Sequence, residues 1–277
     1  MGLDRDTIIT LGSALPPAVG IFGRLEALLR RPDTDLDEIV GLVQVDPALT
    51  FQIIRLGNSA YYGLKQRCAS LEQAVAQIGF GDIHRLVGWV AARHVCQQDL
   101  PAYQMSARHF WENAVATGQL MAALATRSGR DPRQAYATGL MRNLGRIVIN
   151  NYIGAVHYPG PTIAPDLVAW EKSTYDLTAA EVGAVLLEYW RFSPDTVTAV
   201  RTHQNPGLTD PSAAQLHLAG AMVQAWGVGL PGEAPSWHPD ANLLECAGLT
   251  DGHCRTALAE AQAGFAHATG IPWANAA

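Results

Sequence analysis

The sequence predicts an all-α protein, built as a two-lobed helical bundle. Apolar residues recur three and four positions apart along most of the chain, the spacing that gives a helix one buried face. Residues with helix-capping chemistry precede several of these apolar stripes. No two alternating apolar and polar runs are joined by Asn-Gly or Asp-Gly, the strongest short signature of a β-hairpin. Together these observations favour about a dozen helices and little or no sheet.

Five apolar stripes predict the helices of an N-terminal lobe, residues 1–103. Capping-box spacing, Asp35 with Glu38 and Ser70 with Gln73, marks the start of the second and fourth stripes. Asp46-Pro47 precedes the third, with a cap residue before a proline at the first helical position. The stripes run from Ile21 to Leu29, Leu36 to Val43, Leu49 to Leu56, Ala74 to Ile78 and Ile83 to Val90, and Gly79 to Asp82 predicts a turn between the last two.

A C-terminal lobe, residues 104–277, is expected to begin after Asp99-Leu100-Pro101-Ala102, with a long helix starting near Ser106. Its stripes run from Val115 to Leu124, Tyr136 to Val148 and Val182 to Tyr189. Helix starts are indicated by Asp131-Pro132, by Thr178 with Glu181, by Ser193-Pro194 and by Asp210-Pro211. The Pro- and Gly-containing segments 158–165 and 229–239 are expected to be long loops.

The composition excludes several classes of protein. The chain has 277 residues, of which 19 are Lys or Arg and 25 are Asp or Glu, so only 16% are charged while 48% are hydrophobic. Disordered chains have the opposite balance, and a net charge of −6 does not favour a nucleic-acid-binding surface. Four scattered cysteines, no leader-like start and no apolar run near 18 residues lead us to expect a cytoplasmic protein with no membrane contact.

Short motifs follow one another in a fixed order along the chain. They are Leu15-Pro16-Pro17, Asp46-Pro47-Ala48-Leu49, Asn58-Ser59-Ala60-Tyr61-Tyr62-Gly63, Ser70-Leu71-Glu72-Gln73-Ala74-Val75 and Ile78-Gly79. With these motifs, residues 15–229 resemble the HDOD domain, an all-helical bacterial signalling module related to HD-type metal-dependent phosphohydrolases. The resemblance implies an HD-phosphohydrolase-like C-terminal lobe and a role in bacterial regulation.

One of these motifs, formed by Asn58, Ser59, Tyr61, Tyr62 and Gly63, has two interpretations. In the structural one, Asn58 ends a helix in the left-handed conformation, Gly63 permits a positive φ, and the tyrosines pack into the core. In the functional one, the loop contacts a ligand or a partner. The sequence leaves both open.

HD phosphohydrolases hold a divalent metal with a His, a His-Asp pair and a later Asp, and the metal activates a water that attacks phosphorus. The resemblance places these positions at Asn113, at Arg142 with Asn143, and at Gly220. Asn is a poor ligand for such a metal, Gly has no side chain, and Arg is effectively always protonated. We therefore expect no metal, no other cofactor and no catalytic residue.

The residues of this relict pocket also have alternative roles. Arg142 forms a structural ion pair, for instance with Glu112, or it binds the phosphate or carboxylate of a ligand. His203 is retained in Arg201-Thr202-His203-Gln204, and His217 follows on the next helix. These two histidines lack a third ligand.

Three functions follow from these interpretations. The first is a non-catalytic regulatory module that contacts protein partners of a bacterial signalling pathway, with a small anionic ligand in the relict pocket as an option. The second is a divergent phosphohydrolase that uses His203, His217 and an acid such as Glu181. The third is a nucleotide sensor without catalysis, whose ligand binds Arg142.

Overall fold

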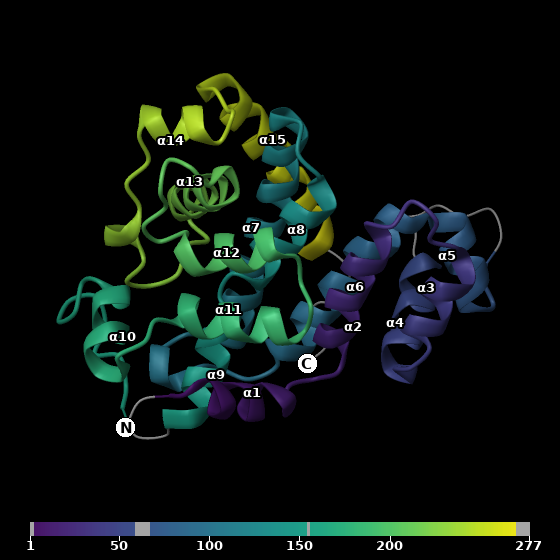
Figure 1. Cartoon of the computed structure of the whole chain (residues 1–277), viewed down its shortest axis with the longest axis horizontal. Helices are drawn as coiled ribbons and strands as arrows, with labels where there is room; N and C mark the ends of the chain where they lie inside the picture. The colour runs from purple at the N-terminus through teal and green to yellow at the C-terminus, as the bar shows by residue number, and fades with distance from the viewer. Residues whose placement is uncertain (1–2, 59–66, 154–155, 270–277) are drawn as a thin grey trace.

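The structure, a computed structural model, describes residues 3–58, 67–153 and 156–269 (Figure 1). These residues form fifteen α-helices and two 3₁₀ turns, and the only β pairing among them is an isolated bridge between Leu100 and Met105. The all-α prediction is confirmed. The elements are α1 (Arg5–Ser13), α2 (Ala18–Leu29), α3 (Leu36–Val43), α4 (Pro47–Gly57), α5 (Leu71–Ile78), α6 (Phe80–Val95), η1 (Pro101–Tyr103), α7 (Ala107–Ser128), α8 (Pro132–Met141), α9 (Leu144–Ile153), α10 (Leu167–Tyr175), α11 (Ala179–Tyr189), α12 (Pro194–Thr202), α13 (Pro211–Trp226), η2 (Ala234–Ser236), α14 (Ala241–Cys246) and α15 (Asp251–Thr269).

The helices α3, α4 and α5 gather at one end of the molecule, and α2 and α6 connect them to the other helices (Figure 1). Phe22 and Ile53 are fully buried in this part. The helices α2 and α6 pack closely because Gly88 has no side chain: a Cβ there would lie 2.5 Å from the Phe22 ring. Gly79, with a φ of +86°, makes the predicted turn between α5 and α6.

The long helix α7 lies at the centre of the remaining helices, and most of its residues are buried. It packs along α8, where a Cβ on Gly139 would lie 2.7 Å from the Thr117 carbonyl oxygen. The last helix, α15, also packs along α7, and α1 packs on α9 and α11 (Figure 1). One continuous hydrophobic core joins residues on both sides of position 103, and the division into two lobes there stays a prediction.

Most of the predicted capping chemistry is confirmed. Asp35 and Thr178 form complete capping boxes with Glu38 and Glu181. Ser70 accepts a hydrogen bond from the Gln73 backbone, but the Gln73 side chain accepts from the Ala69 N–H rather than completing the box. The four cap residues that precede prolines, Asp46, Asp131, Ser193 and Asp210, all accept hydrogen bonds from the first turns of their helices.

The predicted stripe from Tyr136 to Val148 is two helices rather than one. The helix α8 ends at Met141 and α9 begins at Leu144, so Arg142 and Asn143 lie in the turn between them. Leu140 and Leu144 are buried on either side of this break, which is why the apolar spacing continues through it. The turn places two polar side chains in the interior of the protein.

Within the described residues, no single helix has the length and apolar character of a membrane span. The helices α1 and α2 reach that threshold only as a pair, and the chain bends by 103° between them.

Candidate functional site

Four charged side chains form a buried ion network around Arg142, one of the positions at which the resemblance places a metal ligand: Arg142, Arg146, Glu171 and Glu233. Each is at most 2% exposed. Arg142 lies between α8 and α9, Arg146 on α9, Glu171 on α10, and Glu233 in the segment between α13 and α14. Two positive and two negative charges cancel, as burial requires.

Glu233 pairs with both arginines. Its Oε1 and Oε2 accept from Arg142 Nη1 at 3.1 Å and Nη2 at 3.0 Å, a bidentate pair. Arg146 Nη1 donates to Glu233 Oε1 at 2.5 Å, and Arg146 Nε donates to Glu171 Oε1 at 3.3 Å. The Ala179 N–H donates to the other Glu171 oxygen at 2.8 Å. The network therefore connects α9, α10, α11 and the segment that carries Glu233.

The two asparagines at former ligand positions bind this network. Asn113 Oδ1 accepts from Arg142 Nη2 at 3.0 Å and from Asn143 Nδ2 at 3.1 Å. Asn143 Oδ1 accepts from Arg146 Nη1 at 3.0 Å, and Asn113 Nδ2 donates to the Val228 carbonyl at 2.8 Å. Both oxygens that could face a metal are thus occupied by protein donors.

Burial favours the neutral form of every charged group in the network, and the oppositely charged neighbours favour the ionised form. For Glu233, burial favours the neutral acid, but Arg142 and Arg146 lower its pKa to about 2. For Arg146, burial favours the neutral form, but Glu233 and Glu171 raise its pKa above the ordinary value. Burial raises the pKa of Glu171, against the attraction of Arg146. Burial also lowers the pKa of Arg142, which Glu233 counteracts.

Trp237 fills the space beside Gly220, the fourth former ligand position. A Cβ on Gly220 would lie 2.5 Å from the Trp237 ring, so this position has no room for a side chain in the present packing. The Arg142 guanidinium lies 5.2 Å from the centre of the same ring, a cation–π contact. The indole and the guanidinium together occupy the region where the resemblance places a metal.

The two retained histidines are brought together by α12 and α13. His203 Nδ1 lies 2.7 Å from the Val200 carbonyl, and burial followed by the Arg142 charge lowers the His203 pKa to about 3. His217 Nδ1 lies 2.8 Å from the His203 carbonyl, and its Nε2 accepts from the His238 N–H at 2.9 Å. Burial lowers the His217 pKa as well. Both rings are therefore neutral and mostly engaged by backbone groups.

The residues present do not fit a divalent metal. Across the part of the chain that the structure describes, no three His, Cys, Asp or Glu side chains are grouped so that they could hold one. The permanently charged guanidinium of Arg142 would repel a divalent cation at this position. Glu181, the acid considered for an alternative site, instead caps α11 and lies 3.5 Å from Lys172.

The expectation that Arg142 pairs with Glu112 is wrong. Glu112 pairs with Arg108 one turn earlier on α7, at 2.8 Å. The partner of Arg142 is Glu233, 91 residues away in the sequence. Glu112 is adjacent to Asn113 in the sequence, but its carboxylate accepts a hydrogen bond from Arg108 and lies in no contact with Arg142 given by the structure.

Asn58 does not adopt the left-handed conformation that the sequence predicted, since its φ is −82°. Its side chain instead binds the backbone of Cys68. Asn58 Oδ1 accepts from the Cys68 N–H at 2.7 Å, and Nδ2 donates to the Cys68 carbonyl at 2.8 Å. This structural role accounts for the asparagine, while Ser59, Tyr61, Tyr62 and Gly63 lie outside the described residues.

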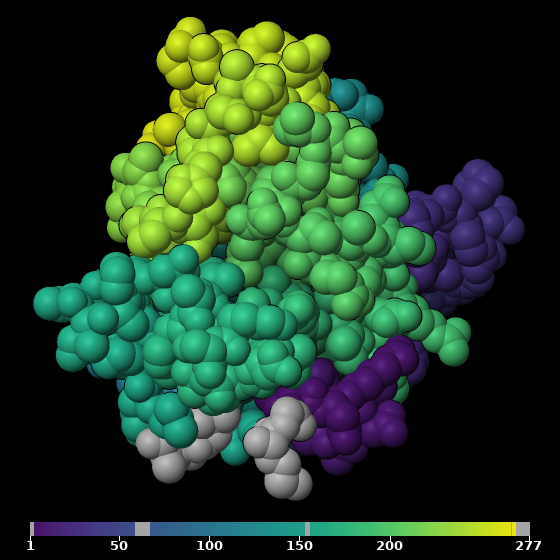
Figure 2. All heavy atoms as spheres, turned by 60° about the vertical axis from the view of Figure 1, so that its left-hand side comes forward, coloured from purple at the N-terminus to yellow at the C-terminus, as the bar shows by residue number. Residues whose placement is uncertain are grey.

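Sequence reasoning missed Arg146, Glu171, Glu233 and Trp237. Glu233 and Trp237 belong to the segment 229–239, which was predicted only as a loop. This segment lies beside α10 on the surface (Figure 2), where the Leu167 N–H donates to the Gly232 carbonyl at 3.0 Å. The signal that could have found these residues is the scarcity of charge: in an apolar chain, an acid within a Pro- and Gly-rich loop is a candidate partner for a buried cation.

Comparisons with known proteins place the chain in a family and show relatives with its fold. The HDOD domain matches residues 15–206. A Treponema pallidum (strain Nichols) protein of uncharacterised function is 27% identical over 192 residues, which are 65% of this chain and 36% of the relative. The chain thus spans well under half the length of that relative.

Two solved structures have the same fold. An HDOD domain protein of unknown function from Geobacter sulfurreducens superposes with a TM-score of 0.66 and 20% identity, covering 96% of this chain and 97% of the other. A protein from Marinobacter aquaeolei VT8, provisionally described as acting in signal transduction, superposes with a TM-score of 0.73 and 21% identity, covering 98% of this chain and 60% of the other.

Proposed function

The chain belongs to the HDOD domain family, and we propose that it is a bacterial regulatory module that acts through contacts with protein partners rather than through catalysis. The single observation that carries this proposal is the bidentate pair of Arg142 with Glu233 at the relict metal site. A phosphohydrolase of this type needs an open metal position beside its substrate. Here a protein cation and its counterion stand at that position.

Several features support the non-catalytic part of the proposal. The ion network is neutral, buried and hydrogen-bonded to both Asn113 and Asn143, so it provides structure where an enzyme would keep exchangeable ligands. His217 uses both ring nitrogens on backbone groups. A phosphate ligand for Arg142 would have to displace Glu233. The Arg142 guanidinium is therefore not available to an anionic ligand while this pair is formed.

The regulatory part rests on the family and on the fold. The Marinobacter protein with the same fold is described in terms of signal transduction. A protein that does not turn over a substrate transmits a signal through what it binds. Its partner must then bind two conformations of the protein with different affinity. Partner proteins of a bacterial signalling pathway are the class of molecule that this proposal implies.

The proposal is tested by metal analysis and by turnover. We expect the purified chain to contain far less than one equivalent of iron, manganese or zinc. We also expect it to hydrolyse bis(4-nitrophenyl) phosphate no faster than the same buffer with added metal. His203→Ala is the matched variant, and its rate should equal that of the wild type. Stoichiometric metal, with turnover that His203→Ala abolishes, would establish the phosphohydrolase alternative instead.

A further inference from the structure

A surface pocket of about 180 Å³ lies between α6 and α9. It is lined by three segments: the link between α1 and α2, the end of α6 with the residues that follow, and α9. The lining residues are Leu15, Pro16, His94, Val95, Gln97, Gln98, Asp99, Leu100, Ile147, Asn150 and Asn151. The first two segments belong to the predicted N-terminal lobe and the third to the C-terminal lobe. A ligand bound here would contact both.

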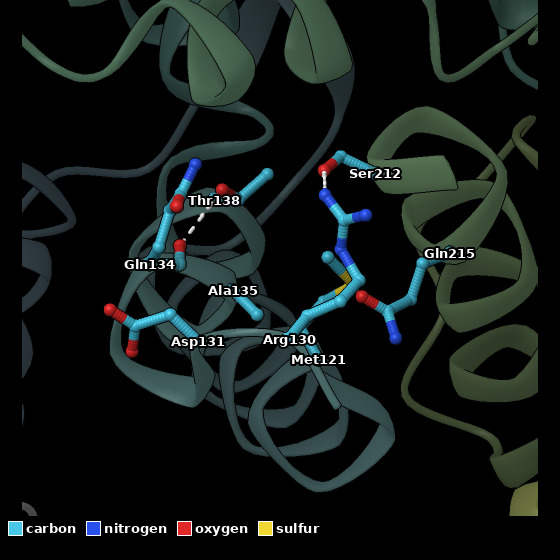
Figure 3. Close-up of a pocket in the computed structure, with 8 residues that line it drawn as sticks. All are labelled: Met121, Arg130, Asp131, Gln134, Ala135, Thr138, Ser212 and Gln215. Atoms are coloured by element: carbon cyan, nitrogen blue, oxygen red, sulfur yellow. Dashed lines mark hydrogen bonds between the residues drawn. The ribbon is translucent and has the colours of Figure 1, made fainter. Parts of the chain in front are cut away.

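The size of the pocket suits a small organic molecule. A cavity of about 150 Å³ holds a benzene molecule, so about 180 Å³ accommodates about six to eight heavy atoms. A cavity between α8 and α13 has about 30 Å³, enough for water only, and Arg130 lies across it with a hydrogen bond to Ser212 (Figure 3). A third, beside Glu26 and His84, has about 10 Å³.

The lining favours a ligand with hydrogen-bond donors and a positive charge. Asp99 is the one acidic residue in the lining, and burial lowers the pKa of His94, the one histidine there. Asp99 uses Oδ1 to accept from the Ala107 N–H at 2.8 Å, and Oδ2 takes no part in that bond. Arg93, the basic neighbour on α6, points to the Trp111 ring at 5.7 Å and does not line the pocket.

The end of α6 adds to this preference. The helix ends at Val95, which lines the pocket, and the negative end of a helix dipole attracts cations. Across the pocket, Asn150 Oδ1 accepts from the Ala102 N–H at 3.0 Å, which fixes α9 against η1. Leu15 and Ile147 supply apolar contacts for a short carbon chain.

We propose that this pocket binds a small organic cation, an aliphatic amine whose ammonium group pairs with Asp99 and the end of α6. The carboxamides of Gln97, Gln98 and Asn151 accept from the remaining donors of the ligand. The apolar wall contacts its carbon chain. This proposal does not depend on the regulatory function, because none of the lining residues belongs to the ion network.

Three molecules of equal length test the charge preference: 1,4-diaminobutane, 1,4-butanediol and succinate. We expect calorimetric titration of the full chain at low salt to detect binding of the diamine, about threefold to fivefold tighter than the diol, and none of succinate. Asp99 is exposed, and Asp99→Asn, which retains the oxygen that accepts from Ala107, should weaken diamine binding about threefold. Asp82→Asn, at the opposite end of α6 and 41% exposed, should leave it unchanged.

Three results would overturn the proposal: no binding of the diamine, equal or tighter binding of the diol or of succinate, or diamine binding that Asp99→Asn leaves unaltered. Leu15→Phe serves as a second variant if Asp99→Asn lowers the melting temperature. It fills the apolar side of the pocket and should abolish diamine binding without removing a charge. These outcomes are separate from those of the metal and turnover assays.

Discussion

Two buried carboxyl groups, Glu233 and Glu26, are equally hidden from water and ionise in opposite ways. Glu233 is 1% exposed and Glu26 is 3% exposed. Arg142 and Arg146, themselves buried, overcome burial and lower the Glu233 pKa to about 2. Burial raises the Glu26 pKa to about 7, because its ion partner Arg30 is 36% exposed and its field is screened by solvent.

The regions around Glu233 and Glu26 also differ in how their other buried polar groups are paired. In the ion network, each of the four charged side chains has an oppositely charged partner from another part of the chain, although Arg142 Nε and Arg146 Nη2 have no hydrogen-bond partner among the described protein groups. Glu26 on α2 lies in what we call the seam, the contact of α2 and α6 with α8, and there His84 has no partner among the described protein groups for either ring nitrogen. Burial alone therefore does not decide charge; the number and burial of the partners do.

The largest expected effect is that of breaking the network. Glu233→Ala leaves Arg142 without its acid and Arg146 with only Glu171, and uncompensated buried charge should cost about 3–5 kcal/mol of unfolding free energy. Urea denaturation measures it. Glu260→Ala, which removes a 60% exposed partner of Arg127, is the control and should cost at most about 1 kcal/mol. Equal losses of unfolding free energy in the two variants would mean that the buried network stabilises the fold no more than a surface ion pair does.

A second prediction concerns pH and the seam. The folded-state pKa of Glu26 is raised to about 7 from an ordinary 4.5, so the folded protein holds a proton that the unfolded chain has released, and stability falls as pH rises between those values. Glu26→Gln removes this loss. Its stability relative to wild type should therefore increase between pH 4.5 and 7, by about 2–3 kcal/mol, and stay level above pH 7.

Glu233→Gln gives the opposite slope and is the matched control for that experiment. With a pKa lowered to about 2, Glu233 contributes stability that is present above pH 4.5 and is lost as pH falls toward 2. Relative to wild type, Glu233→Gln should be least stable above pH 4.5 and should recover at lower pH. A Glu26→Gln difference that does not change with pH would show that the Glu26 pKa is the same in the folded and unfolded states.

A third prediction measures how tightly Trp237 packs against Gly220. Gly220→Ala places a Cβ against the Trp237 ring, and overpacking of this kind should cost about 1–3 kcal/mol in urea denaturation. Gly41→Ala, in a helix with nothing within 4 Å of the added atom, should stabilise by about 0.5–1 kcal/mol. If Gly220→Ala behaves like Gly41→Ala, the indole does not close the site.

The smallest expected effect comes from the unpartnered histidine of the seam. His84 lies 4.9 Å from the Phe22 ring, and burial lowers its pKa to about 3. His84→Phe removes two buried nitrogens without partners and should stabilise by about 1 kcal/mol at pH 7. The gain should grow below pH 6.5, where only the unfolded wild-type histidine takes up a proton.

His203→Phe in the network region is the matched control for that variant. It loses the contact of Nδ1 with the Val200 carbonyl, so it should destabilise at pH 7. Thermal unfolding of both variants at pH 5 and pH 7 separates the two cases. A stability loss in His84→Phe as large as that in His203→Phe would show that His84 makes hydrogen bonds as favourable as those of His203, which would contradict the contrast between the two regions.

Local features of the fold could be predicted from the sequence, and the long-range ones could not. Caps such as Asp46 and Asp131 involve residues two or three positions apart, so their spacing in the sequence contains the interaction. Apolar stripes predict helices for the same reason. The break at Arg142 and Asn143 was missed because the apolar residues on both sides are buried on similar faces, although the chain turns between them.

The candidate site could be predicted only by its positions, and not by its partners. Alignment with the family pattern placed Asn113, Arg142, Asn143 and Gly220, and the structure brings the three side chains and Trp237 together. The partner Glu233 lies in a loop with no helical spacing to locate it. Nothing in one sequence specifies a contact across 91 residues, so the nearest acid, Glu112, was the wrong choice.

The central claim is that a protein ion pair has taken the structural place of the metal, and a double-mutant cycle tests it most directly. The cycle combines Arg142→Met and Glu233→Gln, with unfolding free energies from urea denaturation at pH 7. We predict a coupling energy of about 2 kcal/mol or more, because each residue neutralises the other in the interior. A coupling below about 0.5 kcal/mol, the range of independent sites, would contradict the claim.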